Sequence, residues 1–526
     1  MDALHIVWFK RDLRITDHAA LVNAAQHNAV LALFCWEPSV WVGDDYSAQH
    51  QAFVQECLVD LAAALLKIGV ALHISNASMI ETLQAIQQQS SVAAIYSHEE
   101  TGNTATFMVD KSVANWCKNN QITWHEYPQN GVVRRLKSRD SWHKRWQQHM
   151  NAPLLVAPVN IASAAQIILP VASFIQSKGE DKPKRQRGGR NLAEQFLNSF
   201  LEGRAANYRG GISSPLKAVT SGSRLSPYLA WGCLSMREVV QATHARRTWA
   251  ALNPQLFAKT FCSSLIAFES RLHWHCHFMQ KLESEPQIEY ANMHHAHDKM
   301  RDEHYTNPDT QRRLQAWVNG QTGWPLVDAC MAMLRVTGWV NFRMRAMLMS
   351  TASYLLWLHW RQTGLHLARE FLDYEPGIHW SQTQMQSGTT GINTLRIYNP
   401  IKQAQDQDPT GAFVRHWLPQ LKRVPNTWIF EPYLMPLAQQ QQYGCLLGQD
   451  YPMPLVDIKQ AIKEARAKIS VARKQQGTQI ETQAVIKKHA SRKGMLGSQR
   501  DATGQMQVKR KVPKKLATNP NQTSLF

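Results

Sequence analysis

Two arginines lie in a stretch of the chain that is otherwise apolar and rich in tryptophan. Arg343 and Arg345 stand two positions apart between Thr337 and Trp357. Because taking a guanidinium out of water is costly unless an anion accompanies it, a carboxylate or a phosphate should lie beside them. Asp373 is a carboxylate that could serve. The alternative interpretation is a tryptophan-rich core that contains one internal ion pair.

A second stretch combines small residues, hydroxyls and a guanidinium just before a predicted helix. It consists of Gly222, Ser223, Arg224, Leu225 and Ser226, followed by a proline. Backbone amides, hydroxyls and an arginine together form a set that holds a pyrophosphate. The alternative is a Ser-Pro helix start with an ordinary cap.

Oxidisable rings are concentrated in the same region as the two arginines. Closely spaced indoles let an electron vacancy migrate from ring to ring, whereas core packing is the ordinary role of a single tryptophan. Packing is the better interpretation for Trp339 and Trp357. The tryptophans of this region are Trp317, Trp324, Trp339, Trp357, Trp360 and Trp380.

Histidines at 273, 275 and 277 and at 294, 295 and 297 do not predict a metal site. Alternate positions of a helix point about 200° apart, so such residues do not readily share one ion. The eight cysteines include no C-x-x-C pair, which argues for reduced thiols in a cytoplasmic protein and against zinc.

These residues must be positioned by at least two domains, because 526 residues exceed a single core. Residues 1–135 alternate apolar runs with helical patterns, which predicts a parallel, doubly wound α/β domain. A linker over 136–192 and an all-α domain over 193–455 follow. The predicted strands are Leu4–Phe9, Ala29–Cys35, Val70–Ile74, Val92–Tyr96 and Ile122–Glu126, and helices are predicted near 47–67, 78–88 and 105–118.

Residues 456–526 differ in composition from the rest. From Asp457 onward there are 16 lysines and arginines against 4 acidic residues, a large part of the net charge of +19. A helix is predicted over 457–474, and disorder beyond it, because so polar a segment buries too little apolar surface. The charge favours a nucleic-acid partner. No apolar run of transmembrane length is present, so no membrane association is expected.

Three blocks of the chain resemble the photolyase/cryptochrome family. They are Trp8–Arg14 (WFKRDLR), Gly222–Ser235 (GSRLSPYLAWGCLS) and the stretch from Ala316 to Arg345 with its TGWPLVDA and TGWVNFRMR phrases, followed by RIYNP at 396–400. The resemblance covers roughly residues 4 to 430. It implies an FAD-binding helical domain, and a second antenna chromophore of the folate or deazaflavin type near the α/β domain.

The resemblance also implies roles for individual residues. Electron transfer falls to Trp380 next to the flavin, Trp360 in the middle and Trp317 at the surface. The lesion-binding phrase retains Trp274, but Arg271 and His275 replace its usual acid and arginine. Arg345 and Asp373 would form an ion pair beside the isoalloxazine. The implied FAD-binding residues are Tyr208, Gly222, Ser223, Arg224, Leu225, Ser226, Arg343, Arg345 and Asp373.

The resemblance predicts a light-driven DNA repair enzyme that splits pyrimidine dimers, of the cyclobutane or the (6-4) type, in UV-damaged DNA. The alternative is a cryptochrome-type blue-light photoreceptor that binds FAD without repair, which the substituted lesion phrase favours. The chain ends in QTSLF, which resembles the motif that binds bacterial sliding clamps through Gln522, Leu525 and Phe526. That motif favours repair.

Overall fold

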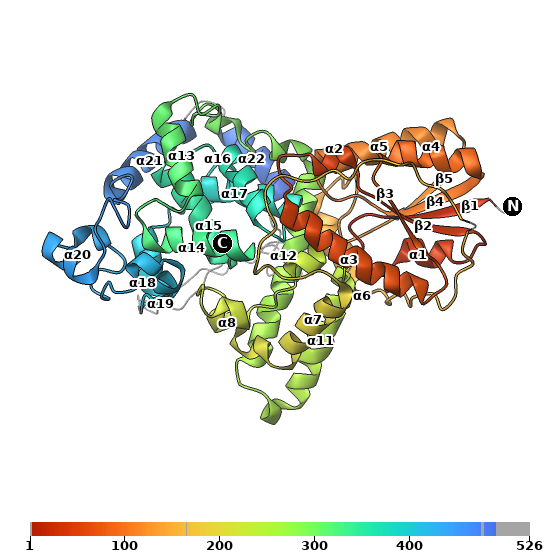
Figure 1. Cartoon of the computed structure of the whole chain (residues 1–526), viewed down its shortest axis with the longest axis horizontal. Helices are drawn as coiled ribbons and strands as arrows, with labels where there is room; N and C mark the ends of the chain where they lie inside the picture. The colour runs from red at the N-terminus through yellow and green to blue at the C-terminus, as the bar shows by residue number, and fades with distance from the viewer. Residues whose placement is uncertain (1–2, 165, 475–477, 491–526) are drawn as a thin grey trace, which may run out of the picture.

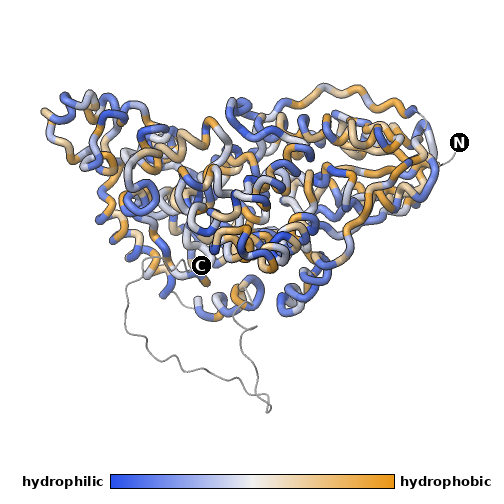
Figure 2. The backbone as a smooth tube through the Cα atoms, turned by 90° about the horizontal axis from the view of Figure 1, so that it is seen from below, coloured by the Kyte–Doolittle hydropathy of each residue, from blue (hydrophilic) through white to orange (hydrophobic). Residues whose placement is uncertain are grey.

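The computed structural model describes residues 3–164, 166–474 and 478–490. It has two parts, a sheet with covering helices at the N-terminal end and a larger assembly of helices (Figure 1). Hydrophobic segments run through the strands of the first part (Figure 2). None of the helices in the described ranges is both long enough and apolar enough to cross a membrane.

The sheet has five parallel strands in the order β3-β2-β1-β4-β5. All five predicted strands are confirmed, with bounds shifted by no more than two residues. Strand β2 is apolar throughout, and the central strand β1 is apolar except for His5, because both faces of the sheet are covered. The strands are β1 (Leu4–Phe9), β2 (Val30–Cys35), β3 (Leu72–Ser75), β4 (Val92–His98) and β5 (Thr123–Tyr127).

Alternate side chains of β1 enter two different cores. Val7 and Phe9 pack with α1 (Ala19–Ala24) and α3 (Ala48–Leu66), whereas Ile6 and Trp8 pack with α4 (Met79–Gln89) and α5 (Thr104–Asn119). This alternation follows from the two-residue period of a strand. The predicted doubly wound arrangement is therefore confirmed, with a further short helix α2 (Pro38–Trp41) after β2.

The predicted linker contains α6 (Trp142–Asn151), which the sequence did not predict. The helical part then begins with α7, as the change of periodicity near residue 193 predicts. Its helices are α7 (Arg190–Glu202), α8 (Tyr208–Gly211), α9 (Ala218–Ser221), α10 (Ser226–Ala230), α11 (Met236–Leu252), α12 (Phe261–Ser284), α13 (Pro308–Val318), α14 (Pro325–Thr337), α15 (Phe342–Ser350), α16 (Trp360–Glu370), α17 (Pro376–Ser387), α18 (Pro400–Gln407), α19 (Ala412–Trp417) and α20 (Leu437–Tyr443).

Two of these helices have clear sequence signals at both ends. Helices α14 and α17 each begin at a proline, whose fixed φ suits the first turn. Each is followed by a glycine in the left-handed region, Gly338 with φ 65° and Gly388 with φ 79°. Helix α17 also crosses α12 very closely, because a Cβ at Gly377 would lie 2.6 Å from the Cα of Met279.

The cores do not follow the predicted domain boundary. One core joins the α1–α3 face of the sheet to α7, α10, α11 and α12. A second core fills the rest of the helical part and contains the buried rings of Trp317, Trp324, Trp360 and Trp380. The sheet and the first helices of the helical part therefore share one hydrophobic interior.

The C-terminal region is more ordered than the sequence predicts. The helix predicted over 457–474 is present as α21 (Ile458–Arg473). The prediction of disorder beyond it is wrong for α22 (Thr478–His489), which buries Val485 and makes charge contacts. His489 hydrogen-bonds to Glu285, and the Nζ of Lys488 lies 3.1 Å from the same carboxylate. The clamp-like residues Gln522, Leu525 and Phe526 lie outside the described residues.

Candidate functional site

The turn from Gly222 to Ser226 joins α9 to α10, and side chains from other segments donate hydrogen bonds to its carbonyl oxygens. Arg204 donates hydrogen bonds to the carbonyl oxygens of Gly222 and Ser223, and Gln186 donates to that of Arg224 at 2.9 Å. With its carbonyls occupied, the turn keeps a fixed backbone. Arg204 and Gln186 carry no sequence signal for this role, because they lie outside the motif.

Arg224 occupies an unusual conformation in this turn. Its φ is +63°, a region that residues other than glycine seldom adopt. Its guanidinium lies 3.8 Å from the centre of the Trp339 ring. Burial lowers the pKa of Arg224 to about 10, although the nearby Asp373 opposes the shift. A half-buried cation that forms no ion pair with the carboxylates of the described residues suits an anionic group of a ligand.

Arg345 and Asp373 form a two-pronged ion pair. The Nη1 and Nη2 atoms of Arg345 lie 2.9 and 3.0 Å from the two carboxylate oxygens of Asp373. Burial alone would raise the pKa of Asp373, but Arg345 and the hydroxyl of Ser226 outweigh it and hold the pKa below its ordinary value. The Ser226 contact joins the turn to the ion pair, so the structure brings these predicted residues together.

Arg343 does not join this pair. Its Nη1 lies 3.4 Å from the side-chain oxygen of Gln403 on α18. Residues two apart on a helix point to different sides, so Arg343 and Arg345 cannot face the same group. The structure therefore separates two arginines that the sequence analysis assigned to one cofactor.

A hollow of about 550 Å³, including space open to solvent, lies beside the ion pair. Its walls are largely apolar, formed by Met349 of α15, Leu367 of α16 and Phe371. Polar groups enter it from Asp373–Glu375 and from α17. The α17 residues that line it are Ile378, His379, Gln382, Thr383 and Gln386.

Several buried polar atoms of this hollow have no hydrogen-bond partner among the described residues. They are Oε1 of Glu375 and both amide atoms of Gln382. Buried polar groups are nearly always satisfied, so a ligand with donors and acceptors is expected here. Apolar walls with a polar edge and a fixed ion pair suit a planar heteroaromatic ring. The residues therefore fit a flavin.

The N-terminal sheet reaches this hollow through Arg11. Its Nη2 lies 2.6 Å from Oε2 of Glu375, and its Nε donates to the carbonyl oxygen of Ala230 at 2.9 Å. Burial raises the pKa of Glu375 to about 7, although Arg11 opposes the shift. The sequence analysis did not assign this contact, because the two residues are far apart in the chain.

Two of the three predicted electron-transfer tryptophans are in ring contact, and all three lie in one core. The rings of Trp360 and Trp380 are 6.0 Å apart between centres and nearly perpendicular. Trp380 also donates a hydrogen bond to the hydroxyl of Tyr374 at 3.1 Å. Trp317 is fully buried and its ring contacts His366. The surface position expected for Trp317 is therefore wrong, since α13 turns this side chain into the core.

The lesion-phrase residues lie on α12. Arg271 and His275 are one turn apart and share a face, and Arg271 Nη2 and His275 Nδ1 have no partner within the part of the chain that the structure describes. Burial lowers the pKa of His275 to about 4, so its ring is neutral at pH 7. Trp274 instead contacts Phe278, with ring centres 5.6 Å apart. Tyr208, a predicted FAD contact, packs on Phe268.

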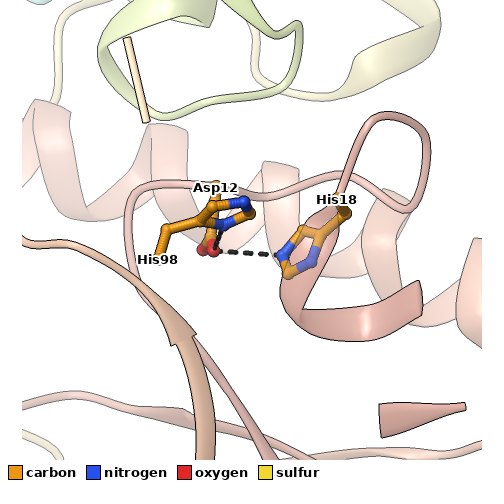
Figure 3. Close-up of side chains that lie close together, drawn as sticks. All are labelled: Asp12, His18 and His98. Carbon is orange, nitrogen blue, oxygen red and sulfur yellow. Dashed lines mark hydrogen bonds and ion pairs between the residues drawn. The ribbon is translucent and has the colours of Figure 1, made fainter. Parts of the chain in front are cut away.

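A second buried polar cluster, which the sequence analysis missed, lies at the ends of β1 and β4 (Figure 3). Nδ1 of His98 lies 2.6 Å and Nε2 of His18 3.0 Å from the same oxygen of Asp12. The backbone N–H of Leu21 donates to Nδ1 of His18 at 3.0 Å. The proton of a neutral His18 is then on Nε2, facing Asp12, so this nitrogen offers no lone pair to a metal. The three side chains are therefore directed at one another, although the contact between His18 and Asp12 lacks hydrogen-bond geometry.

The connection between β4 and α5, in the α/β domain near which the antenna chromophore is expected, is held by its own side chains. One oxygen of Glu100 accepts hydrogen bonds from the backbone N–H groups of Thr101 and Gly102, and Asn103 donates to Asp45 at 2.7 Å. These side chains hold the β4–α5 connection in place.

Comparisons with known proteins agree with this geometry. Residues 5–146 match the family model of DNA photolyase, and residues 268–471 match that of the FAD binding domain of DNA photolyase. Among curated relatives, the cryptochrome DASH of Synechocystis sp. is 26% identical over 88% of this chain and 97% of its own. The deoxyribodipyrimidine photo-lyase of Escherichia coli is 28% identical over 89% and 99%.

Solved structures show the same fold. A bacterial class III photolyase from Agrobacterium tumefaciens superposes with a TM-score of 0.76 at 23% identity, over 90% of this chain and 98% of the other. An archaeal photolyase from Sulfolobus tokodaii, solved with two FAD molecules, gives 0.72 at 21% identity over 89% and 100%.

The α/β domain is followed by a helical domain that contains the hollow. This helical part belongs to the class of FAD-binding domains. The chain is a member of the photolyase/cryptochrome family. Its relatives include both repair enzymes and cryptochromes.

Proposed function

We propose that this protein is a light-driven DNA repair flavoprotein that splits UV-induced pyrimidine dimers. The observation that carries the proposal is the hollow beside Arg345 and Asp373, with unsatisfied polar atoms on Glu375 and Gln382. When bound, reduced FAD supplies a photoexcited electron donor. The protein's own residues exclude water from this donor, fix its position and bind the damaged bases beside it.

The binding roles are divided between two parts of the site. The turn 222–226 offers backbone amides and Arg224 to the pyrophosphate. The Arg345–Asp373 pair holds the polar edge of the ring system while remaining neutral overall, so no net charge is buried. Gln382 completes the polar contacts from α17.

The lesion would be bound by α12. A dimer flipped out of the duplex needs an aromatic surface to stack on and neutral or cationic groups to receive its carbonyls and phosphates. Trp274 provides the aromatic surface, and Arg271 and His275 provide the groups that receive the carbonyls and phosphates. The neutral His275 is a donor or acceptor for a pyrimidine edge.

Absorption and repair assays together test this function. The purified full-length protein should show flavin bands, and blue light should remove dimers from oligonucleotides that carry either cyclobutane or (6-4) lesions. Replacing Trp274 by alanine should weaken lesion binding by about 1–3 kcal/mol, the contribution of one stacked base. Trp249→Ala, which removes a half-exposed tryptophan of α11, is the matched control. Lesion loss that does not depend on light would contradict the proposal.

The second candidate is a blue-light photoreceptor without repair. The replacement of the usual acid and arginine of the lesion phrase by Arg271 and His275 favours it, as do the cryptochromes among the relatives. Bound flavin that is reduced by light, together with unchanged lesions of both types, would establish this function instead.

The terminal motif gives a separate prediction. If Gln522, Leu525 and Phe526 bind a sliding clamp, deletion of Leu525 and Phe526 should abolish retention on immobilised clamp, because two apolar anchors enter one pocket. Removal of two residues elsewhere in the tail is the control. Equal retention of the deleted and full-length proteins would dismiss this partner.

A further inference from the structure

One tyrosine joins the hollow to the N-terminal domain. Tyr374 lines the hollow and is 2% exposed. Its hydroxyl donates to Oδ2 of Asp45 at 2.7 Å and accepts from Nε1 of Trp380 at 3.1 Å. Trp380 is not among the residues that line the hollow. Tyr374 is thus the nearer of the two oxidisable rings to the expected cofactor.

The surroundings of Trp380 oppose its oxidation. The guanidinium of Arg361 lies 4.5 Å from the centre of its ring, and Arg361 forms no ion pair with any described residue. Removing an electron from an indole leaves a cation, at least at first. A cation on Trp380 would face the charge of Arg361 at short range. The carboxylates of Asp45 and Glu289 interact with Arg361 but form no ion pair with it among the described residues, so they offset this repulsion only in part.

The surroundings of Tyr374 favour its oxidation. A phenol that loses an electron must also lose its proton, and Asp45 is placed to accept it. Asp45 is 7% exposed and takes part in no ion pair formed by described residues. Burial raises its pKa, which makes its carboxylate a better proton acceptor. The electron and the proton then leave together, so no net charge develops on the ring.

Further rings continue from Tyr374 into the N-terminal domain. The ring centre of Tyr374 is 5.6 Å from that of Tyr46, which is 5.2 Å from that of Trp41. Trp41 is in turn 4.8 Å from Trp36. An electron vacancy on Tyr374 therefore has a row of oxidisable neighbours that leads away from the hollow.

We propose that Tyr374, with Asp45 as its proton acceptor, is the residue of this chain that gives an electron to photoexcited oxidised FAD. This inference rests on the proposed function, because it requires FAD in the hollow. In the step, one electron passes from the phenol to the oxidant, the Tyr374 O–H bond breaks, and the proton moves to Oδ2 of Asp45. A neutral phenoxyl radical and a protonated carboxyl group result. In this arrangement Tyr374 lies closer to the FAD than Trp380 does.

Electron paramagnetic resonance tests the proposal without reference to repair. The FAD-loaded, full-length protein is grown with ring-deuterated tyrosine, illuminated with blue light in the oxidised state without added donor, and frozen. The expected signal is a tyrosyl radical whose hyperfine splitting collapses on deuteration. Tyr374→Phe should lose this signal and slow photoreduction about tenfold or more, whereas Trp380→Phe should keep it.

Two controls separate the radical site from general damage. Tyr354→Phe removes the hydroxyl of another tyrosine that is 2% exposed in the helical part, and should leave the signal unchanged. Asp45→Asn cannot accept the proton and should reduce the radical yield, whereas Asp44→Asn, at an exposed neighbour paired with Lys178, should not. The wild-type radical should also form more slowly in D₂O, which decides the question if Tyr374→Phe fails to fold.

The possible failures are distinguishable. A tryptophanyl signal in the wild type, together with unchanged photoreduction in Tyr374→Phe, would overturn the role of Tyr374 and leave the proposed function intact. A protein that takes up no FAD would overturn the proposed function itself.

Discussion

The molecule contains two buried polar clusters that differ in one respect. At Asp12, His18 and His98, two imidazoles are directed at one carboxylate oxygen beside the ends of two strands (Figure 3), and Nε2 of His18 lies 3.0 Å from that oxygen without hydrogen-bond geometry. Around Arg345 and Asp373 the ion pair is complete, but three atoms of the neighbouring Glu375 and Gln382 have no hydrogen-bond partner among the described residues, and both residues line a hollow. Several unsatisfied polar atoms beside a hollow indicate a ligand site, whereas the side chains of the first cluster are directed at one another.

The largest effect should follow from opening the ion pair of the hollow. Asp373→Ala leaves the guanidinium of Arg345, whose side chain is 21% exposed, without its carboxylate. This should lower the free energy of unfolding by about 3 kcal/mol, the lower end of the range for buried pairs, because solvent screens part of the charge. Urea unfolding measures the loss, and flavin absorbance of the purified protein should fall with it. Asp406→Ala breaks the exposed pair with Lys402 and should cost under about 1 kcal/mol. Full flavin content in Asp373→Ala would contradict the assigned site.

A smaller effect is expected in the cluster of Asp12, His18 and His98. Asp12→Asn keeps the shape of the side chain but replaces an acceptor by an amide that faces two imidazoles, which should cost about 1–3 kcal/mol. Flavin content should not change, because the cluster does not contact the hollow. Zinc should leave the melting temperature of the wild type unaltered. A zinc-dependent increase that Asp12→Asn abolishes would instead make the cluster a metal site.

Lowering the pH should destabilise both regions, because each contains a buried histidine that is neutral in the folded protein. Burial lowers the pKa of His98 in the cluster and of His379 in the hollow, each to about 3. Since the unfolded pKa is about 6.5, unfolding takes up protons between these values, and stability is lost as the pH falls below 6.5. His98→Gln and His379→Gln should each reduce the slope of unfolding free energy against pH by up to about 1.4 kcal/mol per pH unit. The exposed His416→Gln should leave the slope unchanged.

The smallest effect distinguishes the two neighbouring arginines. Arg343→Ala removes only a long contact to Gln403 and should cost under about 1 kcal/mol with normal flavin content. Arg345→Ala should lose flavin. Equal flavin loss in both variants would mean that Arg343 also reaches the cofactor.

The sequence predicts the parts of this molecule that depend on local pattern. Apolar runs identify all five strands, and the types of Arg345 and Asp373 identify a buried pair, because an unpaired guanidinium is so unfavourable. The spacing of Arg343 and Arg345 does not show that the two side chains point to different sides, and the resemblance places Trp317 at the surface although its side chain is buried. The direction of a side chain depends on how its helix packs, which composition and spacing do not give.

Long-range polar contacts could not be predicted. His18 and His98 meet at Asp12 only because β1 and β4 are adjacent in the sheet. Tyr374 reaches Asp45 across more than 300 residues. Helix α22 is stabilised by its contacts to Glu285, which a count of charges in the tail cannot reveal. Such contacts are specified by topology, so they become visible only when the chain is folded.

Because the sheet and the first helices share one hydrophobic core, the α/β part and the helical part depend on each other to bury their apolar side chains. Val7 and Phe9 of β1 lie in the same core as Leu197 of α7 and Leu272 of α12. A truncated chain that starts near residue 193 would present that apolar surface to water and aggregate, although the boundary looks like a convenient cloning point. For the same reason, replacing the α/β half by that of a relative should disrupt the packing, because the exchanged residues would have to fit the shared core.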